Sequence, residues 1–173
     1  TKDGTDVADK EISAEVVNLE QKLEANNLAI IDKRSSLAEL QTQIDPLSNQ
    51  ITDLKTQKTN LLAKYNEEIL KQSSTILSDE EINKSKELAD QFNNELSNIT
   101  NQISIAEQES SLLQQQVQDL NIELTNEIAN KTQLQNNIKN LNNQLSANQE
   151  ILSQKTLELD QLKHLEKLTY LEF

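Results

Sequence analysis

The chain has 173 residues, of which one is Gly, one is Pro, 2% are aromatic and none is Cys, Met or Trp. So few turn formers and large apolar side chains exclude an ordinary globular domain of this length, and the lack of Cys excludes disulfides and thiolate zinc sites. A formal net charge of −13 argues against nucleic acid as a partner, because phosphate binding depends on clustered Lys and Arg.

Apolar residues recur at alternating steps of four and three along the first part of the chain, from Ile12 to Tyr65. These steps average about 3.5 residues, the coiled-coil repeat that keeps one apolar stripe, the seam, against a partner helix. We expect residues 1–8, which include Gly4, to be a frayed lead-in. Residues 9–72 should form the first coiled-coil helix.

Pro46 lies inside this helix, where proline ordinarily costs ~3 kcal/mol and kinks or ends a helix. The repeat nevertheless keeps its phase from Ile44 to Leu47, which an inserted loop would shift. We therefore predict a continuous helix with a kink near Pro46. The alternative is a true break, with Asp45 as the cap of a new helix.

The repeat changes phase once, where Ser78 and Glu81 have the spacing of a capping box. In that motif the Ser hydroxyl accepts a bond from the backbone N–H of the Glu, whose carboxylate accepts one from the N–H of the Ser. We predict a hairpin tip at 73–77, a second coiled-coil helix over 78–168, and a tail over 169–173 that leads into a further domain. A single helix with a three-residue stammer is the alternative.

A hairpin folded at this tip lets the two seams be paired layer by layer. If the first helix ends and the second begins at the same level at the tip, Leu54 faces Leu96 and Tyr65 faces Ser85. It also sets polar seam residues against apolar ones: Asn26 faces Leu124, Lys33 faces Val117 and Glu127 faces Leu23. A pairing shifted by one heptad is disfavoured because it moves the turn into the helix ends, and a parallel dimer would stack like charges. The predicted fold class is thus all-α: a long antiparallel helical hairpin, or intramolecular coiled coil, whose second helix is the longer.

At ~1.5 Å per residue the second helix should outrun the first from about residue 141. Apolar residues beyond that point, Leu145 included, then have no seam within the chain to cover them. We expect a protein partner, or a second copy in a dimer, to bind there. The candidate residues are Leu152, Leu159, Leu162, Leu165, Leu168, Leu171 and Phe173, and a second candidate contact lies at the tip, at Ile76 and Leu77.

Catalytic and ligand motifs are not found in the sequence. His164 is the only His, and one Gly cannot build a phosphate-binding loop. We expect no catalytic residue, no metal, no cofactor and no small-molecule substrate. Without a run of ~20 apolar residues, direct membrane insertion is not expected either.

The bias toward Asn, Gln, Lys and Ile, together with the lack of Cys and Met, resembles the coiled-coil stalk regions of Gram-positive surface or secreted proteins. This compositional resemblance implies a rigid stalk or spacer that presents or separates other domains, with a role such as adhesion, and an extracellular or cell-surface location. Two alternatives stay open. One is a regulatory coiled-coil arm of an envelope enzyme such as a peptidoglycan hydrolase, and the other is a self-associating dimerisation module.

Overall fold

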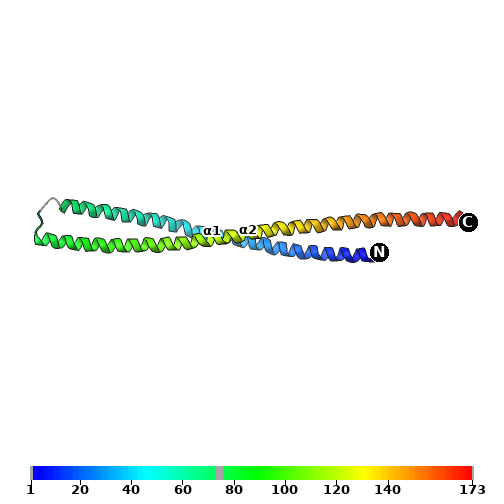
Figure 1. Ribbon diagram of the computed structural model, residues 1–173, viewed down its shortest axis with the longest axis horizontal. Coiled ribbons are helices and arrows are strands. Elements are labelled where there is room, and N and C mark those ends of the chain that lie inside the picture. Colours follow the sequence, from blue (N-terminus) through cyan, green and yellow to red (C-terminus); the bar gives the residue numbers. More distant parts are fainter. Residues whose placement is uncertain (1, 73–75, 173) are drawn as a thin grey trace. The chain divides into compact units, whose positions relative to one another are not determined.

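The computed structural model describes residues 2–72 and 76–172, and the side chains of 7–72 and 76–171. The described residues form two helices, α1 over Lys2–Gln72 (71 residues) and α2 over Asp79–Glu172 (94 residues) (Figure 1). Asp9 contacts Asn148, and Asn26 contacts Glu127, so the two helices run antiparallel. The predicted all-α antiparallel hairpin with a longer second helix is confirmed.

The helix ends differ from the predicted ones. α1 begins at Lys2, earlier than the predicted residue 9, and the fraying of residues 1–8 stays a prediction. One Gly costs a helix only ~1 kcal/mol, less than the packing of the following turns supplies. α2 continues to Glu172 instead of ending at 168, because neither Gly nor Pro interrupts it.

α1 is continuous through Pro46, so the alternative of a break at this residue is wrong. The lost backbone hydrogen bond is offset by the packing of buried leucines that follow the proline. Leu47 and Leu54 are each 8% exposed, and burial of a leucine contributes about 1.5–3 kcal/mol. The kink at this residue stays a prediction.

The start of α2 has the predicted capping box. The backbone N–H of Glu81 donates to Ser78 Oγ at 3.3 Å, and the N–H of Ser78 donates to Glu81 Oε2 at 3.4 Å. Ile82 N–H donates to the Ser78 carbonyl at 2.9 Å, closing the first helical turn. Because α1 ends at Gln72 and residues 76–78 are not helical, the stammered single helix is wrong. Residues 73–75 of the predicted tip lie outside the described residues.

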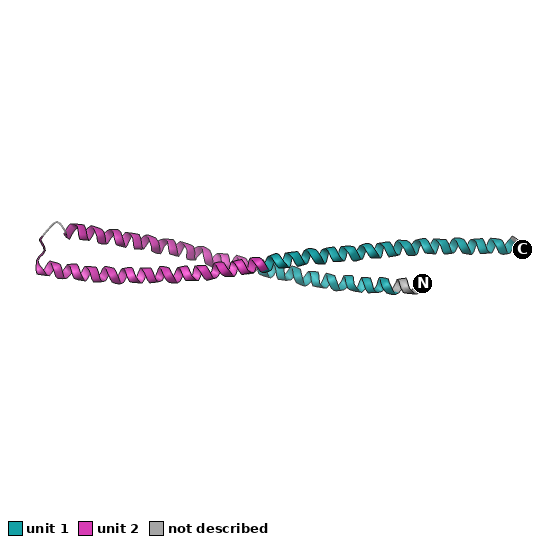
Figure 2. Cartoon of the chain, viewed as in Figure 1, with its two compact units in different colours: residues 1–33, 123–173 teal, residues 34–122 magenta. Residues whose placement is uncertain are grey.

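The hairpin divides into two compact units, each a pair of antiparallel helical segments (Figure 2). Unit 1 comprises residues 1–33 and 123–173, and unit 2 comprises 34–122. Every buried apolar residue among the described side chains falls on the predicted seam. They are Val16, Leu19, Ile30 and Leu134 in unit 1, and Leu47, Leu54, Ile103 and Ala106 in unit 2.

The register of the pairing is one heptad away from the predicted one. In unit 2 the Tyr65 ring stacks on Phe92, with centroids 4.0 Å apart and planes 7° apart, so Tyr65 does not pair with Ser85. Ser85 Oγ instead donates to Gln72 Oε1 at 2.7 Å. In unit 1 Asn148 Nδ2 donates to Asp9 Oδ1 at 3.0 Å.

The prediction failed because it assumed that both helices end level at the tip. Gln72, the last residue of α1, contacts Ser85, while α2 already begins at Asp79. The first turns of α2 therefore extend beyond the end of α1 (Figure 1). The shift also brings the two largest seam side chains into an aromatic stack, worth about 0.5–1.5 kcal/mol beyond area burial.

Candidate functional site

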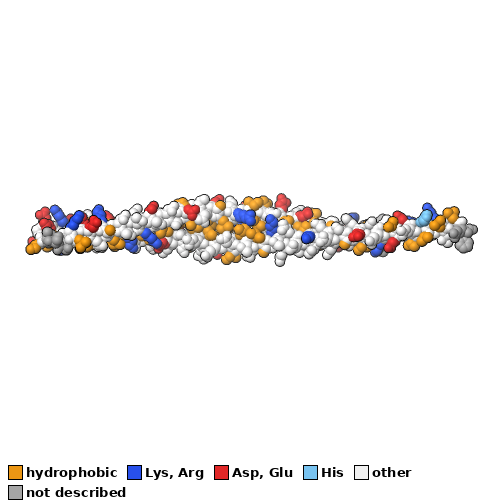
Figure 3. Space-filling view, turned by 90° about the horizontal axis from the view of Figure 1, so that it is seen from above, with side chains coloured by type: hydrophobic (Ala, Val, Ile, Leu, Met, Phe, Trp, Pro, Cys, Tyr) orange, Lys and Arg blue, Asp and Glu red, His pale blue; other side chains and the backbone are white. Residues whose placement is uncertain are grey.

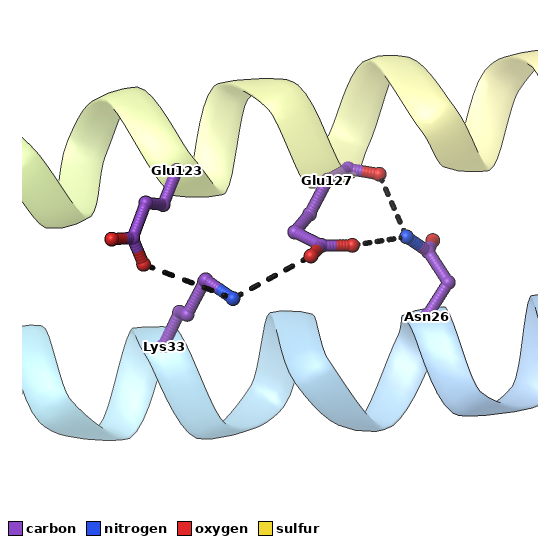
Figure 4. A network of polar contacts seen from close by, with 4 residues as sticks. All are labelled: Asn26, Lys33, Glu123 and Glu127. Carbon is purple, nitrogen blue, oxygen red and sulfur yellow. Dashed lines mark hydrogen bonds and ion pairs between the residues drawn. The ribbon is translucent and has the colours of Figure 1, made fainter.

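A polar network lies on the seam of unit 1 (Figure 4). Asn26 is 5% exposed, and its Nδ2 donates to the backbone carbonyl of Glu127 at 3.0 Å and to Glu127 Oε2 at 2.6 Å. Lys33 Nζ lies 3.5 Å from Glu127 Oε1 and 4.0 Å from Glu123 Oε2. Both helices thus contribute to one chain of contacts, Asn26 to Glu127 to Lys33 to Glu123.

Glu127 is the central residue of the network, because its carboxylate accepts a hydrogen bond from Asn26 and forms an ion pair with Lys33. The Lys33 and Glu127 side chains are 22% and 29% exposed, whereas Glu123 is 59% exposed, so water screens the outer pair more strongly. Asn26 Oδ1 is the one buried side-chain oxygen or nitrogen without a partner in the described part of the chain. A buried amide at a seam position generally lowers stability and favours one register and orientation.

Sequence reasoning missed this network because it set polar seam residues against apolar ones. The pairings of Asn26 with Leu124, Lys33 with Val117 and Glu127 with Leu23 are wrong. Leaving a buried polar group without a partner costs about 1–3 kcal/mol, so polar groups on facing seams are more stable together. The heptad pattern alone did not reveal these contacts, because a shift of seven residues again sets seam positions against seam positions.

The seam of unit 2 has its own lateral ion pair. Lys55 Nζ lies 2.8 Å from Glu107 Oε1, with the two side chains 57% and 49% exposed. Pairs this exposed contribute about 0–1 kcal/mol and weaken with salt. The Lys55–Glu107 pair therefore adds little to the free energy of unfolding, and it sets opposite charges against each other across the two helices.

Burial along the seam of α2 ends at Leu152. Leu141, Leu145, Asn148 and Leu152 are half-buried, and every described side chain from 153 to 171 is exposed. The uncovered segment therefore begins at residue 153, 12 residues later than the predicted residue 141. Leu145 is covered because the register is shifted. We call residues 153–172 of α2 the overhang.

The structure places most of the predicted partner-binding residues on the overhang. Leu159 is 52% exposed, and Leu162, Leu165, Leu168 and Leu171 are 62%, 58%, 46% and 83% exposed. Leu152 is half-buried and belongs to the hairpin seam, and Phe173 lies outside the described residues. Figure 3 shows hydrophobic side chains gathered at this end on the face that it displays.

Two further exposed apolar residues of the overhang were not among the predicted partner-binding residues, Leu157 at 60% and Tyr170 at 86%. They lie off the seam that the heptad analysis followed. At the tip, Ile76 is fully exposed and Leu77 is half-buried. Only Ile76 of this pair is freely available to a partner.

Among the described residues, His, Cys, Asp and Glu form no group of three that could hold a metal. In the same part of the chain, the search for a helix apolar and long enough to cross a membrane finds none. The candidate functional features are the polar network of unit 1, the overhang and the exposed Ile76 at the tip.

These features define the class of protein as an antiparallel coiled-coil hairpin. The chain matches no protein-family model, and neither a curated protein nor a solved structure shows significant similarity to it.

Proposed function

We propose that the protein is a non-enzymatic structural and interaction module. The paired helices serve as a stiff spacer, and the overhang is the surface that contacts a protein partner. The composition, similar to that of Gram-positive stalk regions, supports a place on the bacterial cell surface or among secreted proteins.

One observation carries the proposal: the seam of α2 loses its cover after Leu152 while the helix continues to Glu172. Seven apolar side chains on the overhang are between 46% and 86% exposed: Leu157, Leu159, Leu162, Leu165, Leu168, Tyr170 and Leu171. Isolated helices draw little stability from propensity alone and gain most of it by packing an apolar face. A helical segment with this many solvent-exposed leucines is suited to packing against another chain.

The spacer role rests on helix continuity and on the seam. α1 has 71 residues and contains its one Pro without a break. Buried leucines and isoleucines recur in both units, so bending either helix pair would separate packed side chains. The outer positions carry mostly polar and charged residues that keep the surface solvated.

A distance measurement along α1 tests the stiffness. Spin labels at Gln21 and Thr56, both exposed, stand five heptads apart on the outer face of the helix. At ~1.5 Å per residue a stiff helix separates them by about 52 Å. The chain has no Cys, so cysteines introduced at these positions carry the labels uniquely.

The control pair is Thr42 and Thr56, which lie within unit 2 at about 21 Å. Equally narrow distance distributions for both pairs support the spacer. A broad or shortened distribution for Gln21 and Thr56 beside a narrow control would show a hinge in α1, and the spacer role would be abandoned.

A further inference from the structure

The leucines of the overhang do not form one stripe. From Leu159 to Leu171 they recur every three residues, and each step falls about 60° short of a full turn. The leucines therefore wind around the helix and reach the side opposite the hairpin seam.

On that opposite side a second heptad stripe appears, which we call the outer stripe. It consists of Leu157, Gln161, His164, Leu168 and Leu171, at steps of four, three, four and three. The seam side carries Leu159 and Leu162 instead. Since α1 packs on the seam side, the outer stripe is free over its whole length, and Leu157, Leu168 and Leu171 are 60%, 46% and 83% exposed.

From Leu157 to Leu168 the outer stripe complements itself when a second copy runs antiparallel to it. Leu157 then faces Leu168 of the second copy, and Gln161 faces His164 of the second copy. A two-fold axis repeats both layers, as a dimer of identical chains requires. The two central polar layers lie between two leucine layers, an arrangement that favours a single register.

The charges beside the stripe agree with this pairing. In the same register Asp160 stands next to Lys167 of the second copy, and the two-fold axis repeats this ion pair. Both residues are exposed and border the stripe. A shift by one heptad sets Leu157 against Gln161, and a parallel arrangement removes both ion pairs and stacks His164 on His164.

We propose that the overhang binds a second copy of this chain, antiparallel, through the outer stripe. This inference rests on the proposed role of the overhang and names its partner. The contact involves fewer residues than the 20–30 on each side of a standard interface. A weak dimer that forms at micromolar concentrations is therefore expected.

Charge reversal in the full chain tests the pairing by sedimentation equilibrium between about 1 and 200 µM, a range that spans weak affinities. D160K sets two lysines together at each end of the contact, and K167D sets two aspartates together. Each variant should weaken association on the order of tenfold, as expected for two exposed ion pairs that become repulsive. An equimolar mixture of the two variants restores both ion pairs in the mixed dimer and should recover the original affinity.

The matched control is D119K, which makes the same charge change at an exposed position away from the overhang. It should associate like the unchanged chain, and a chain ending at Leu152 should stay monomeric. An unchanged chain that is monomeric at 200 µM overturns the second copy as partner and leaves the spacer measurement untouched. Association that survives D160K, or a mixture that fails to recover, overturns the antiparallel geometry.

Discussion

Replacing Asn26 with Asp changes only the amide nitrogen to an oxygen, yet it removes the donor on which the polar network depends. Asn26 Nδ2 donates both to the backbone carbonyl and to the carboxylate of Glu127. A neutral hydrogen bond contributes about 0.5–1.5 kcal/mol and one to a charged group about 1.5–3 kcal/mol. In place of these bonds, N26D puts two carboxylates together at a position that is 5% exposed.

We expect N26D to lower the free energy of unfolding by about 3–5 kcal/mol at neutral pH, the range for breaking a buried polar pair. In a chain of this size that corresponds to a fall in Tm of about 10 °C, followed by circular dichroism at 222 nm.

Asn18→Asp is the matched control, since Asn18 lies exposed on the same helix in the same unit. It should change stability by less than about 0.5 kcal/mol. Adding Glu127→Gln to N26D supplies an amide donor from the other helix and should recover most of the loss. Equal Tm values for N26D and N18D would refute the network as a contributor to the fold.

Two further predictions concern unit 2. Leu54→Ala, at a residue 8% exposed, should cost about 2–5 kcal/mol in urea unfolding, while Leu112→Ala, at a residue 62% exposed, should cost little; similar losses would contradict the assigned seam. A double-mutant cycle of Tyr65→Ala and Phe92→Ala should give a coupling free energy of about 0.5–1.5 kcal/mol. Coupling of Tyr65 to Ser85 in place of Phe92 would favour the register shifted by one heptad.

The sequence predicted most of the secondary structure because its signals are local. The seam identified the buried residues from Val16 to Leu134, and the Ser78 and Glu81 capping box placed the start of α2 to within one residue. The helix termini at Lys2 and Glu172 were missed. Terminal residues have weak local preferences, and neighbouring packing decides whether they stay helical.

The candidate surfaces were predicted only in part. A bare apolar end of α2 was expected, and the exposed Leu159 to Leu171 agree with it. The start of this exposed segment was predicted too early, because the length of α2 that α1 covers depends on the register and on where α1 begins. The polar network was missed for the same reason, since Asn26 meets Glu127 only when the register is right.

By itself the sequence determined that two long helices pair through a heptad seam and reverse near Ser78. It did not determine which heptad of one helix faces which heptad of the other. A shift of seven residues returns every seam position to a seam position, so apolar periodicity scores both registers alike. The tertiary structure decided between them through contacts that do not repeat with the heptad: the Tyr65 and Phe92 stack, the Asn26 and Glu127 hydrogen bonds, and the uneven helix ends at the tip.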